Sequence, residues 1–433
     1  MNQAAPGAAP VYTVESACRA CGGSDLHPVL SFGDTPIADR LLENSDLSLS
    51  EPMVPLTLVF CPACGLLQIV ETVDPQTLFG DAYPYFSSTS VSWLRQCRDN
   101  ALELIRILGL DRDSRVVEIA SNDGYMLRNF RDAGIPVLGF EPADPPARAA
   151  LDDGIPTRRE FFTEETAAQL AAESETADLV LANNVVAHVD DLHDFLRGVK
   201  RILNDGGMFV LEVAYAGDLI ERRAFDTIYH QHLCYFTLTP LERLLAGHGF
   251  HVRDVRRLPS QGGSIRVYAG LTPGSASANV RAMLEQERRS GILEEECLEA
   301  FACRIAELRT ELVDLLNEMK ARGGRIAAYG AAGKATTLLH YCGIGASLVE
   351  YIVDLNPYKH GKYMPGCRLV IQPPDRLRED RPDYLLLLAW NLRDEILAQQ
   401  QDYLAAGGRI ITPIPRPEIV AGTPSPDTGG VNY

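Results

Sequence analysis

Short apolar runs separated by turns of glycine, aspartate and asparagine recur through the middle of the chain. They predict strands at 115–120, 136–141, 178–182 and 208–213, and helices at 92–108, 125–132 and 191–203. Strands that alternate with helices across short turns are typical of a parallel sheet covered by helices on both faces. We therefore predict a doubly wound α/β domain in the centre of the chain.

A second α/β block follows further along the chain. Its predicted strands are 325–329, 348–353, 384–389 and 409–412, with a helix running from the glycine-rich turn at 330–333 through Tyr341. Between the two blocks, residues 276–321 lack proline and place apolar side chains at every third or fourth position. This period predicts one or two long helices, which serve either as a solvent-exposed spacer or as a packed brace between domains.

Four of the ten cysteines form two tight pairs, Cys18 with Cys21 and Cys61 with Cys64. Each C-x2-C pair directs two thiolates to one tetrahedral centre, so the two pairs together complete a four-sulfur zinc site. A zinc ion held by four thiolates has no open coordination position, which predicts a structural metal. The alternative is that two dithiol pairs lie near each other by coincidence.

Composition narrows the class of partner. The 433 residues include 40 Lys and Arg against 58 Asp and Glu, a formal net charge of −18. Such a charge disfavours nucleic acid and anionic membranes, and no apolar stretch approaches the ~20 residues that span a bilayer. We expect a cytoplasmic monomer or weak homo-oligomer of four segments, at 11–75, 76–275, 276–322 and 323–433.

The turn after the first central strand is a candidate cofactor site, because ligands bind at such a crossover in doubly wound sheets. Its sequence resembles the S-adenosylmethionine loop of class I methyltransferases. Glu141 ends the next strand, where it can accept hydrogen bonds from ribose hydroxyls. A dinucleotide fingerprint needs G-x-G-x-x-G, which the turn lacks, so nicotinamide binding or a ligand-free loop are the alternatives. The candidate residues are Glu118, Ala120, Ser121, Asn122, Asp123, Gly124, Glu141 and Asn183.

The densest group of titratable side chains is Tyr229-His230-Gln231-His232. If this segment is extended, His230 and His232 share one face. A base with a near-neutral pKa is what enolate formation next to a ketone requires. His188 follows the strand end that faces the donor in such sheets. The alternatives for the run are a polar sheet edge or an incidental metal site.

These motifs occur together and in order with an aromatic and hydroxyl run at 83–90, Gly-Gly-Ser-Ile-Arg at 262–266 and Tyr-Gly-Ala-Ala-Gly-Lys at 329–334. The combination resembles the deoxysugar C-methyltransferases that build the branched sugars of antibiotics, over essentially the whole chain beyond Pro10. The resemblance implies a zinc-binding N-terminal module and a class I S-adenosylmethionine-dependent methyltransferase domain. It also implies a C-terminal Rossmann-like α/β domain that helps to hold a nucleotide-linked sugar.

The reaction implied by the resemblance is methylation at C3 of a nucleotide-linked (TDP-type) 4-keto deoxysugar. His232 would remove the C3 proton, and Tyr229 and His188 would hydrogen-bond the developing oxyanion. Lys334 follows a glycine-rich turn at a predicted helix N-terminus, which favours an anion such as the diphosphate. The expected substrate contacts are Tyr83, Tyr85, Phe86, Ser87, Arg266, Lys334 and Lys359.

Two positions depart from the family pattern. The family's run reads Tyr-His-Glu-His and its glycine turn His-Gly-Gly-Ser, whereas this chain has Gln231 and Gln261. A glutamine side chain neither takes up a proton nor carries a charge at these positions. The alternatives are therefore a related ketosugar-modifying enzyme, such as an epimerase or a methyltransferase for another position, or a non-catalytic protein that binds nucleotide sugars.

Overall fold

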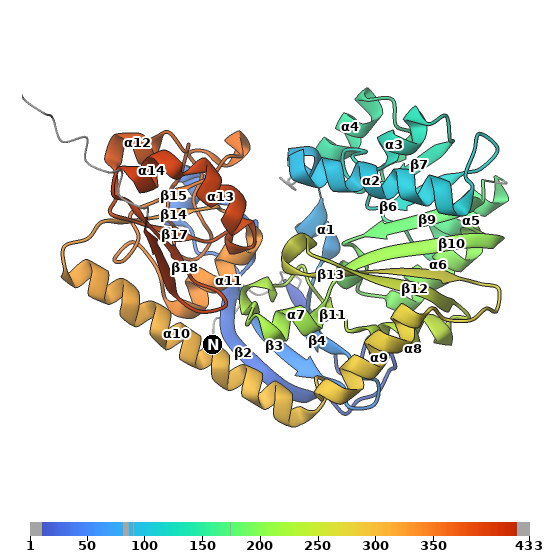
Figure 1. Cartoon of the computed structure of the whole chain (residues 1–433), viewed down its shortest axis with the longest axis horizontal. Helices are drawn as coiled ribbons and strands as arrows, with labels where there is room; N and C mark the ends of the chain where they lie inside the picture. The colour runs from blue at the N-terminus through green and yellow to red at the C-terminus, as the bar shows by residue number, and fades with distance from the viewer. Residues whose placement is uncertain (1–10, 81–85, 90, 174, 422–433) are drawn as a thin grey trace, which may run out of the picture. The chain divides into compact units, whose positions relative to one another are not determined.

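The computed structural model describes residues 11–80, 86–89, 91–173 and 175–421 and divides the chain into two compact units (Figure 1). Each unit is assembled from three stretches of chain. The first unit comprises Met1–Ser31, Thr57–Asp218 and His230–Cys297, and the second comprises Phe32–Leu56, Leu219–Tyr229 and Leu298–Tyr433. The boundaries of the four segments expected from the sequence remain predictions.

The first unit is built on a seven-stranded sheet of order β12-β13-β10-β9-β6-β7-β8. Five strands run parallel, and β13 is antiparallel to both of its neighbours. The predicted parallel sheet is thus confirmed, with an antiparallel pair added at one edge. The strands are β6 (Val116–Ile119), β7 (Val137–Phe140), β8 (Thr157–Arg158), β9 (Ala177–Asn183), β10 (Leu203–Ala214), β12 (His251–Leu258) and β13 (Ser264–Gly270).

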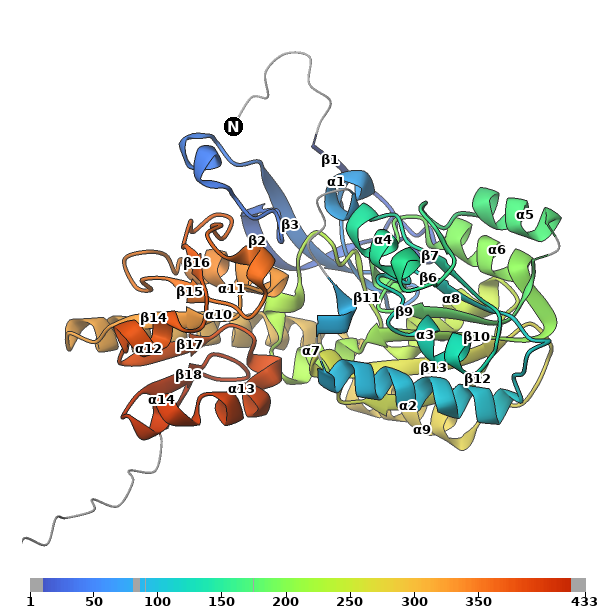
Figure 2. The same cartoon turned by 90° about the horizontal axis from the view of Figure 1, so that it is seen from above.

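Helix α6 shows how a helix of this unit packs through one apolar face. On α6 the buried positions Leu192, Phe195, Leu196, Val199 and Ile202 recur at helical spacing, as the pattern of the sequence predicts. The helix α2 runs along the sheet (Figure 2) and shares a buried core with α3, β6 and β9. The helices are α1 (Pro75–Phe79), α2 (Val91–Leu108), α3 (Leu127–Asp132), α4 (Asp144–Asp152), α5 (Glu164–Ala172), α6 (Leu192–Ile202), α7 (Ala216–Glu221), α8 (Leu238–Gly247) and α9 (Ala278–Ser290).

A four-stranded sheet of order β11-β4-β3-β2 carries the cysteine pairs. Its strands are β2 (His27–Pro36), β3 (Met53–Phe60), β4 (Leu67–Ile69) and β11 (Cys234–Tyr235), and β1 (Tyr12–Val14) pairs separately with β5 (Glu71–Val73). The strand β11 comes from the middle of the chain, directly after the candidate histidines. This pairing therefore ties the N-terminal sheet to the segment that holds them.

The second unit contains a six-stranded sheet of order β16-β15-β14-β17-β18-β19, in which all strands but β19 are parallel. The predicted strand at 348–353 shortens to two residues. The strands are β14 (Ile326–Tyr329), β15 (Ile352–Val353), β16 (Ile371–Gln372), β17 (Tyr384–Leu387), β18 (Arg409–Thr412) and β19 (Glu418–Ala421). The helices are α10 (Glu295–Ala321), α11 (Gly333–Cys342), α12 (Arg376–Asp380), α13 (Arg393–Gln399) and α14 (Gln401–Ala405).

The helical stretch predicted at 276–321 consists of two helices, α9 and α10. The break follows Gly291, whose φ of +62° suits a residue without a side chain. On α10, apolar side chains from Leu298 to Met319 are buried at every third or fourth position, so this helix is packed along its length. A solvent-exposed spacer is thereby excluded for α10.

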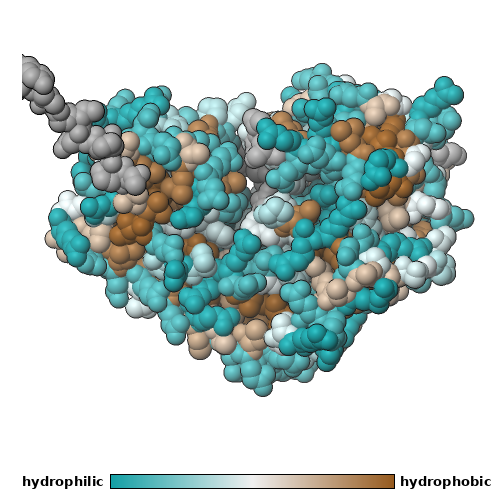
Figure 3. All heavy atoms as spheres, in the orientation of Figure 1, coloured by the Kyte–Doolittle hydropathy of each residue, from teal (hydrophilic) through white to brown (hydrophobic). Residues whose placement is uncertain are grey.

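The visible surface carries mostly hydrophilic side chains between smaller apolar areas (Figure 3). Within the described residues, no helix combines the length and the hydropathy needed to cross a lipid bilayer.

A buried ion pair joins two strands of the first sheet. Glu212 on β10 lies opposite Arg266 on β13, and Arg266 Nη2 is 2.9 Å from Glu212 Oε2. Arg266 Nη1 donates to Asn100 Oδ1 at 2.6 Å, and the Ser260 hydroxyl donates to Glu212 Oε1 at 2.8 Å. A buried charge that loses its partner is strongly destabilising, so both members of the pair are needed for stability.

We expect Arg266→Leu to lower the free energy of unfolding by about 3–5 kcal/mol, because Glu212 is left buried without a cation. Arg256→Leu is the matched control. Arg256 lies beside Arg266 on β12, and its side chain is 35% exposed in its ion pair with Glu103, so its loss should cost about 1 kcal/mol or less. Urea unfolding measures both variants. Equal losses would contradict a central role for the Glu212 pair.

Candidate active site and metal centre

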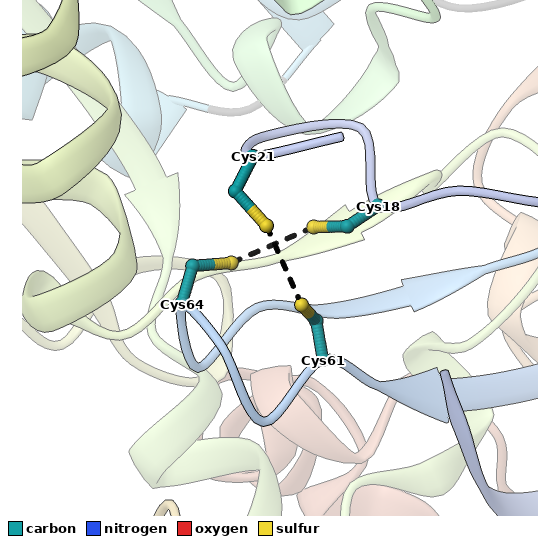
Figure 4. A group of neighbouring side chains, drawn as sticks. All are labelled: Cys18, Cys21, Cys61 and Cys64. Carbon is teal, nitrogen blue, oxygen red and sulfur yellow. Dashed lines mark hydrogen bonds between the residues drawn. The ribbon is translucent and has the colours of Figure 1, made fainter. Parts of the chain in front are cut away.

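The four paired cysteines converge on one point (Figure 4). The Sγ atoms of Cys18 and Cys64 are 3.5 Å apart, as are those of Cys21 and Cys61, and all four lie within 4.8 Å of one another. A tetrahedral zinc with Zn–S bonds of about 2.3 Å separates its sulfurs by about 3.8 Å. Four thiolates at this spacing fit zinc, and the predicted ligand set is brought together as a structural site.

The donor loop, residues 120–124, follows β6 in a conformation that is rare for residues with a side chain. Ala120 has φ +54° and Asn122 has φ +50°, while Gly124 has φ +73°. Asparagine tolerates the left-handed region through its short polar side chain, whereas alanine gains no such compensation there. The loop therefore stores strain at Ala120, next to the candidate donor site.

Two side chains of this loop hold the segment that precedes α2. Asn122 Oδ1 accepts a hydrogen bond from the Ser87 backbone N–H at 2.8 Å, and Asp123 Oδ2 accepts one from Ser88 at 3.1 Å. These bonds satisfy the first amides of a short 3-10 helix at Ser87–Thr89. The candidate donor loop thus also anchors the segment that contains the candidate substrate residues Phe86 and Ser87.

Two carboxylates flank the donor loop. Glu141 accepts hydrogen bonds from the backbone N–H of Asn122 at 2.9 Å and of Ala143 at 2.8 Å, and burial raises its pKa to about 7. Glu118 is fully buried, which raises its pKa to about 8, and it accepts a bond from Asn183 Nδ2 at 3.1 Å. The structure therefore brings Glu118, Glu141 and Asn183 to the same end of the sheet.

Within the described part of the chain, several buried polar atoms around this loop lack a hydrogen-bond partner, among them Glu118 Oε2 and three others. The three others are Ser121 Oγ, Asp123 Oδ1 and Asn183 Oδ1. Unsatisfied buried acceptors are costly unless a ligand or water completes them. S-adenosylmethionine carries an ammonium group, a sulfonium and ribose hydroxyls, and oxygen acceptors of this kind suit all three. The residues present therefore fit the donor.

The candidate histidines lie ring to ring. His188 is the last residue of a short 3-10 helix, Val186–His188, five residues beyond the end of β9. The ring centroids of His188 and His232 are 4.8 Å apart, and His188 Nδ1 donates to the backbone carbonyl of Gln231 at 2.5 Å. Because a carbonyl only accepts, Nδ1 carries the hydrogen. Burial lowers the pKa of His188 and so favours its neutral form.

The expectation of an extended segment at 229–232 is wrong. Residues 229–231 form a bend and a turn, because the backbone changes direction between a 3-10 helix at Phe225–Thr227 and β11. His230 is fully buried while His232 is half-buried, so the two rings do not share one face. Tyr229 is half-buried at the start of the turn.

Lys334 lies in the first turn of α11, in a cluster that the sequence did not reveal. Its ammonium donates to Asn391 Oδ1 and stands 4.3 Å from the centroid of the Trp390 ring. Trp390 donates to Asp226 Oδ2 at 2.7 Å, and Asp226 partly offsets the burial that lowers the Lys334 pKa to about 8. No sequence pattern signals this cluster, because Asp226, Lys334 and the adjacent pair Trp390 and Asn391 are separated by more than 50 residues.

The other expected substrate contacts are distributed over the chain. Lys359 Nζ donates to the Ala331 carbonyl at 2.7 Å, in the glycine-rich turn before α11. The carboxylate of Asp39 lies against Gly333, where an added Cβ would come within 2.5 Å of Asp39 Oδ2. Arg266 is engaged by Glu212 and Asn100 inside the sheet, and its contact with a substrate stays a prediction. Tyr83 and Tyr85 lie outside the described residues.

Three known families match successive parts of the chain. Residues 18–79 match the family described as "Putative zinc binding domain", residues 92–255 "Methyltransferase domain" and residues 259–415 "C-methyltransferase C-terminal domain". The C-methyltransferase NovU of Streptomyces niveus is 38% identical over 408 residues, which cover 93% of this chain and 96% of that protein. An uncharacterized methyltransferase of Mycobacterium leprae (strain Br4923) is 27% identical over 96 residues, covering 22% of this chain and 35% of that protein.

Solved structures resemble the chain only in part. A 1,6-didemethyltoxoflavin-N1-methyltransferase of Burkholderia thailandensis, solved with 1,6-didemethyltoxoflavin and S-adenosylhomocysteine, is 20% identical. The match covers 40% of this chain and 76% of that one at a TM-score of 0.31, and we infer nothing further from it.

We expect Ala120→Gly to stabilise the protein by about 0.5–1 kcal/mol, because glycine adopts a φ of +54° without the steric cost of a Cβ. Ala168→Gly, in the middle of α5, is the matched control and should destabilise by about 1 kcal/mol. Urea unfolding compares the two. Destabilisation by both substitutions would contradict strain at Ala120.

Proposed function

Because the chain belongs to the C-methyltransferase family that includes NovU, we propose that it methylates C3 of a nucleotide-linked 4-keto deoxysugar. It is an S-adenosylmethionine-dependent methyltransferase with a structural zinc site. The observation that carries the proposal is the pair His188 and His232, since His188 follows the same strand that ends in Asn183 of the donor site. We place the reaction in the cytoplasm, on a route to a branched antibiotic sugar.

His232 acts as the base in this proposal. A 4-ketone acidifies the neighbouring C3–H bond. A half-buried imidazole is therefore suited to removing that proton in neutral solution. S-adenosylmethionine, when bound, would supply an electrophilic methyl group to the sugar carbanion and would leave as the thioether. The contribution of the chain is to hold the base, the sugar carbon and the donor in line.

The oxyanion that develops on the 4-oxygen needs a hydrogen-bond donor. The Tyr229 hydroxyl can donate in its ordinary neutral form. Neutral His188 has its hydrogen on Nδ1, which faces the Gln231 carbonyl, so its Nε2 is an acceptor. We therefore assign the donor role to Tyr229, with His188 joining it only as an imidazolium.

The donor is held by residues of the first unit. Glu141 lies where it can accept hydrogen bonds from the ribose hydroxyls, and the unsatisfied oxygens of Asp123 and Asn183 are suited to the ammonium group. Ala120, Ser121 and Gly124 let the backbone approach the cofactor, as small residues do in such turns.

The diphosphate is assigned to the second unit, at Lys334 and Lys359. Lys359 reaches the glycine-rich turn before α11, Lys334 lies in the first turn of that helix, and the N-terminus of a ten-residue helix favours an anion. Asp39 already lies against Gly333, so its carboxylate has to move away or take up a proton when the diphosphate binds.

Gln231 stands where the family has a glutamate, and this difference bears on an alternative function. Its backbone carbonyl positions His188 and its side chain is buried, so the loss of a carboxylate here removes a charge close to the two histidines. A chain that moves the C3 proton without transferring a methyl group would be a ketosugar epimerase. The next experiment separates the two functions.

We expect His232→Ala to slow exchange of the sugar C3 proton in D2O by roughly 10²–10⁴-fold, the usual contribution of a positioned base. The probe is a TDP-4-keto deoxysugar, and mass spectrometry follows deuterium uptake apart from methyl transfer. His251→Ala, an exposed histidine on β12, is the control and should exchange at the wild-type rate.

Exchange in His232→Ala at the wild-type rate would assign the base to another residue. Exchange in wild type without any methylated product would favour the epimerase. Absence of both reactions with all 4-keto sugars tested would refute the proposed function.

We expect Lys334→Gln to weaken binding of thymidine diphosphate by about ten- to a hundredfold, because a charge-assisted hydrogen bond contributes about 1.5–3 kcal/mol. Affinity for S-adenosylmethionine should stay unchanged. Lys362→Gln is the control, since Lys362 pairs with Glu43 at 3.0 Å outside the turn. Isothermal titration calorimetry measures both ligands, and an unchanged diphosphate affinity in Lys334→Gln would place the diphosphate elsewhere.

A further inference from the structure

Arg19 lies between the first two zinc ligands, yet its side chain points into the protein, where it is only 2% exposed. Its Nη2 donates to the Thr72 hydroxyl at 2.7 Å, and its Nη1 donates to the Asp190 carbonyl at 3.4 Å. Asp190 is two residues beyond His188. The guanidinium therefore links the first C-x2-C pair to the loop that carries one of the two histidines.

Gln68 makes the second link. Its side chain accepts from the Arg19 backbone N–H at 2.8 Å and donates to the Ala17 carbonyl at 3.2 Å. It is therefore bonded to both residues that flank Cys18. Its backbone lies opposite Cys234 in the pairing of β4 with β11. Cys234 is two residues beyond His232, and Gln68 is fully buried. The first cysteine pair is thus connected to the second histidine as well.

Hydrogen bonds between the two histidine loops close the network. The Leu233 backbone N–H donates to the Ala187 carbonyl at 2.8 Å, and the Leu233 carbonyl accepts from Ile69 at 3.0 Å. His188 itself donates to the Gln231 carbonyl. Each histidine therefore lies within two residues of a backbone group that is hydrogen-bonded either to the cysteine-bearing sheet or to Arg19.

We propose that Arg19 is a positioning residue for the His188–His232 pair, so that the zinc centre sets the geometry of the active site in addition to stabilising its own module. Only a planar fork of donors reaches two acceptors on separate elements, here Thr72 on β5 and the loop at Asp190. The catalytic part of this inference rests on the proposed function.

The test compares Arg19→Gln with Arg243→Gln in the full-length, zinc-loaded protein. Arg243 is the matched control, because its Nη1 donates to the Cys64 carbonyl at 3.1 Å and so reaches the second cysteine pair from α8. Each variant is analysed for zinc content, S-adenosylmethionine affinity, kcat and KM. The rate at which diethyl pyrocarbonate modifies His188 and His232 is followed against pH by peptide mass spectrometry.

We expect Arg19→Gln to keep one zinc per chain and its donor affinity, while kcat falls about ten- to a hundredfold with little change in KM, as for a small misplacement of reacting groups. The modification rates of both histidines should change at least threefold, with a shifted pH midpoint. Arg19→Lys should not restore the wild-type rates, because an ammonium lacks the fork. Arg243→Gln should match wild type throughout.

Thr72→Val provides a second variant that leaves every charge and zinc ligand in place and removes one acceptor of the Arg19 fork. It should move the two histidine rates in the same direction as Arg19→Gln, and it decides the matter if Arg19→Gln loses zinc or fails to fold. Unchanged histidine rates in Thr72→Val, or equal effects of Arg19→Gln and Arg243→Gln, would overturn the inference. The modification assay needs no sugar. If the wild type methylates no 4-keto sugar, the proposed function is refuted, but the role of Arg19 in positioning the histidines is still tested.

Discussion

The pairing of β4 with β11 is the contact on which the candidate active site depends most. It joins only two residues on each strand, Leu67 and Gln68 with Tyr235 and Cys234. Yet it fixes the end of the segment that runs from the 3-10 helix at Phe225–Thr227 through the turn to β11. This end is next to His232. A two-residue strand gains little stability by itself, so it persists because the sheet beside it is held by the cysteine cluster. The cysteine cluster therefore helps to hold a segment that lies about 170 residues further along the chain.

The elements that the sequence predicted well are those with strong local patterns. The strands β6, β7, β9 and β18 are mostly apolar runs next to turn residues, and the cysteine spacing identifies its ligands without tertiary information. The two-residue strands β8, β11, β15 and β16 carry no detectable period, because their existence depends on the neighbour with which they pair.

Partnerships between distant residues were also out of reach of the sequence. The ion pair of Arg266 with Glu212, 54 residues away, is one example. The turn at 229–231 likewise follows from the need to place β11, which no alternation of side chains in the run reveals. In contrast, the donor loop could be located from its strand and small-residue turn, although the capping of Ser87 and Ser88 by Asn122 and Asp123 could not.

Asn122 contributes to two candidate subsites at once. Its backbone N–H donates to Glu141, the candidate ribose acceptor, while its side chain holds Ser87 at the edge of the candidate sugar segment. One residue thus belongs to both subsites, so displacement at either end is felt at the other. Linkage between two sites is reciprocal. If the bound sugar nucleotide changes the affinity for the donor by some factor, the bound donor changes the affinity for the sugar nucleotide by the same factor. If both proposed subsites are correct, Asn122 is the residue through which such a coupling would pass.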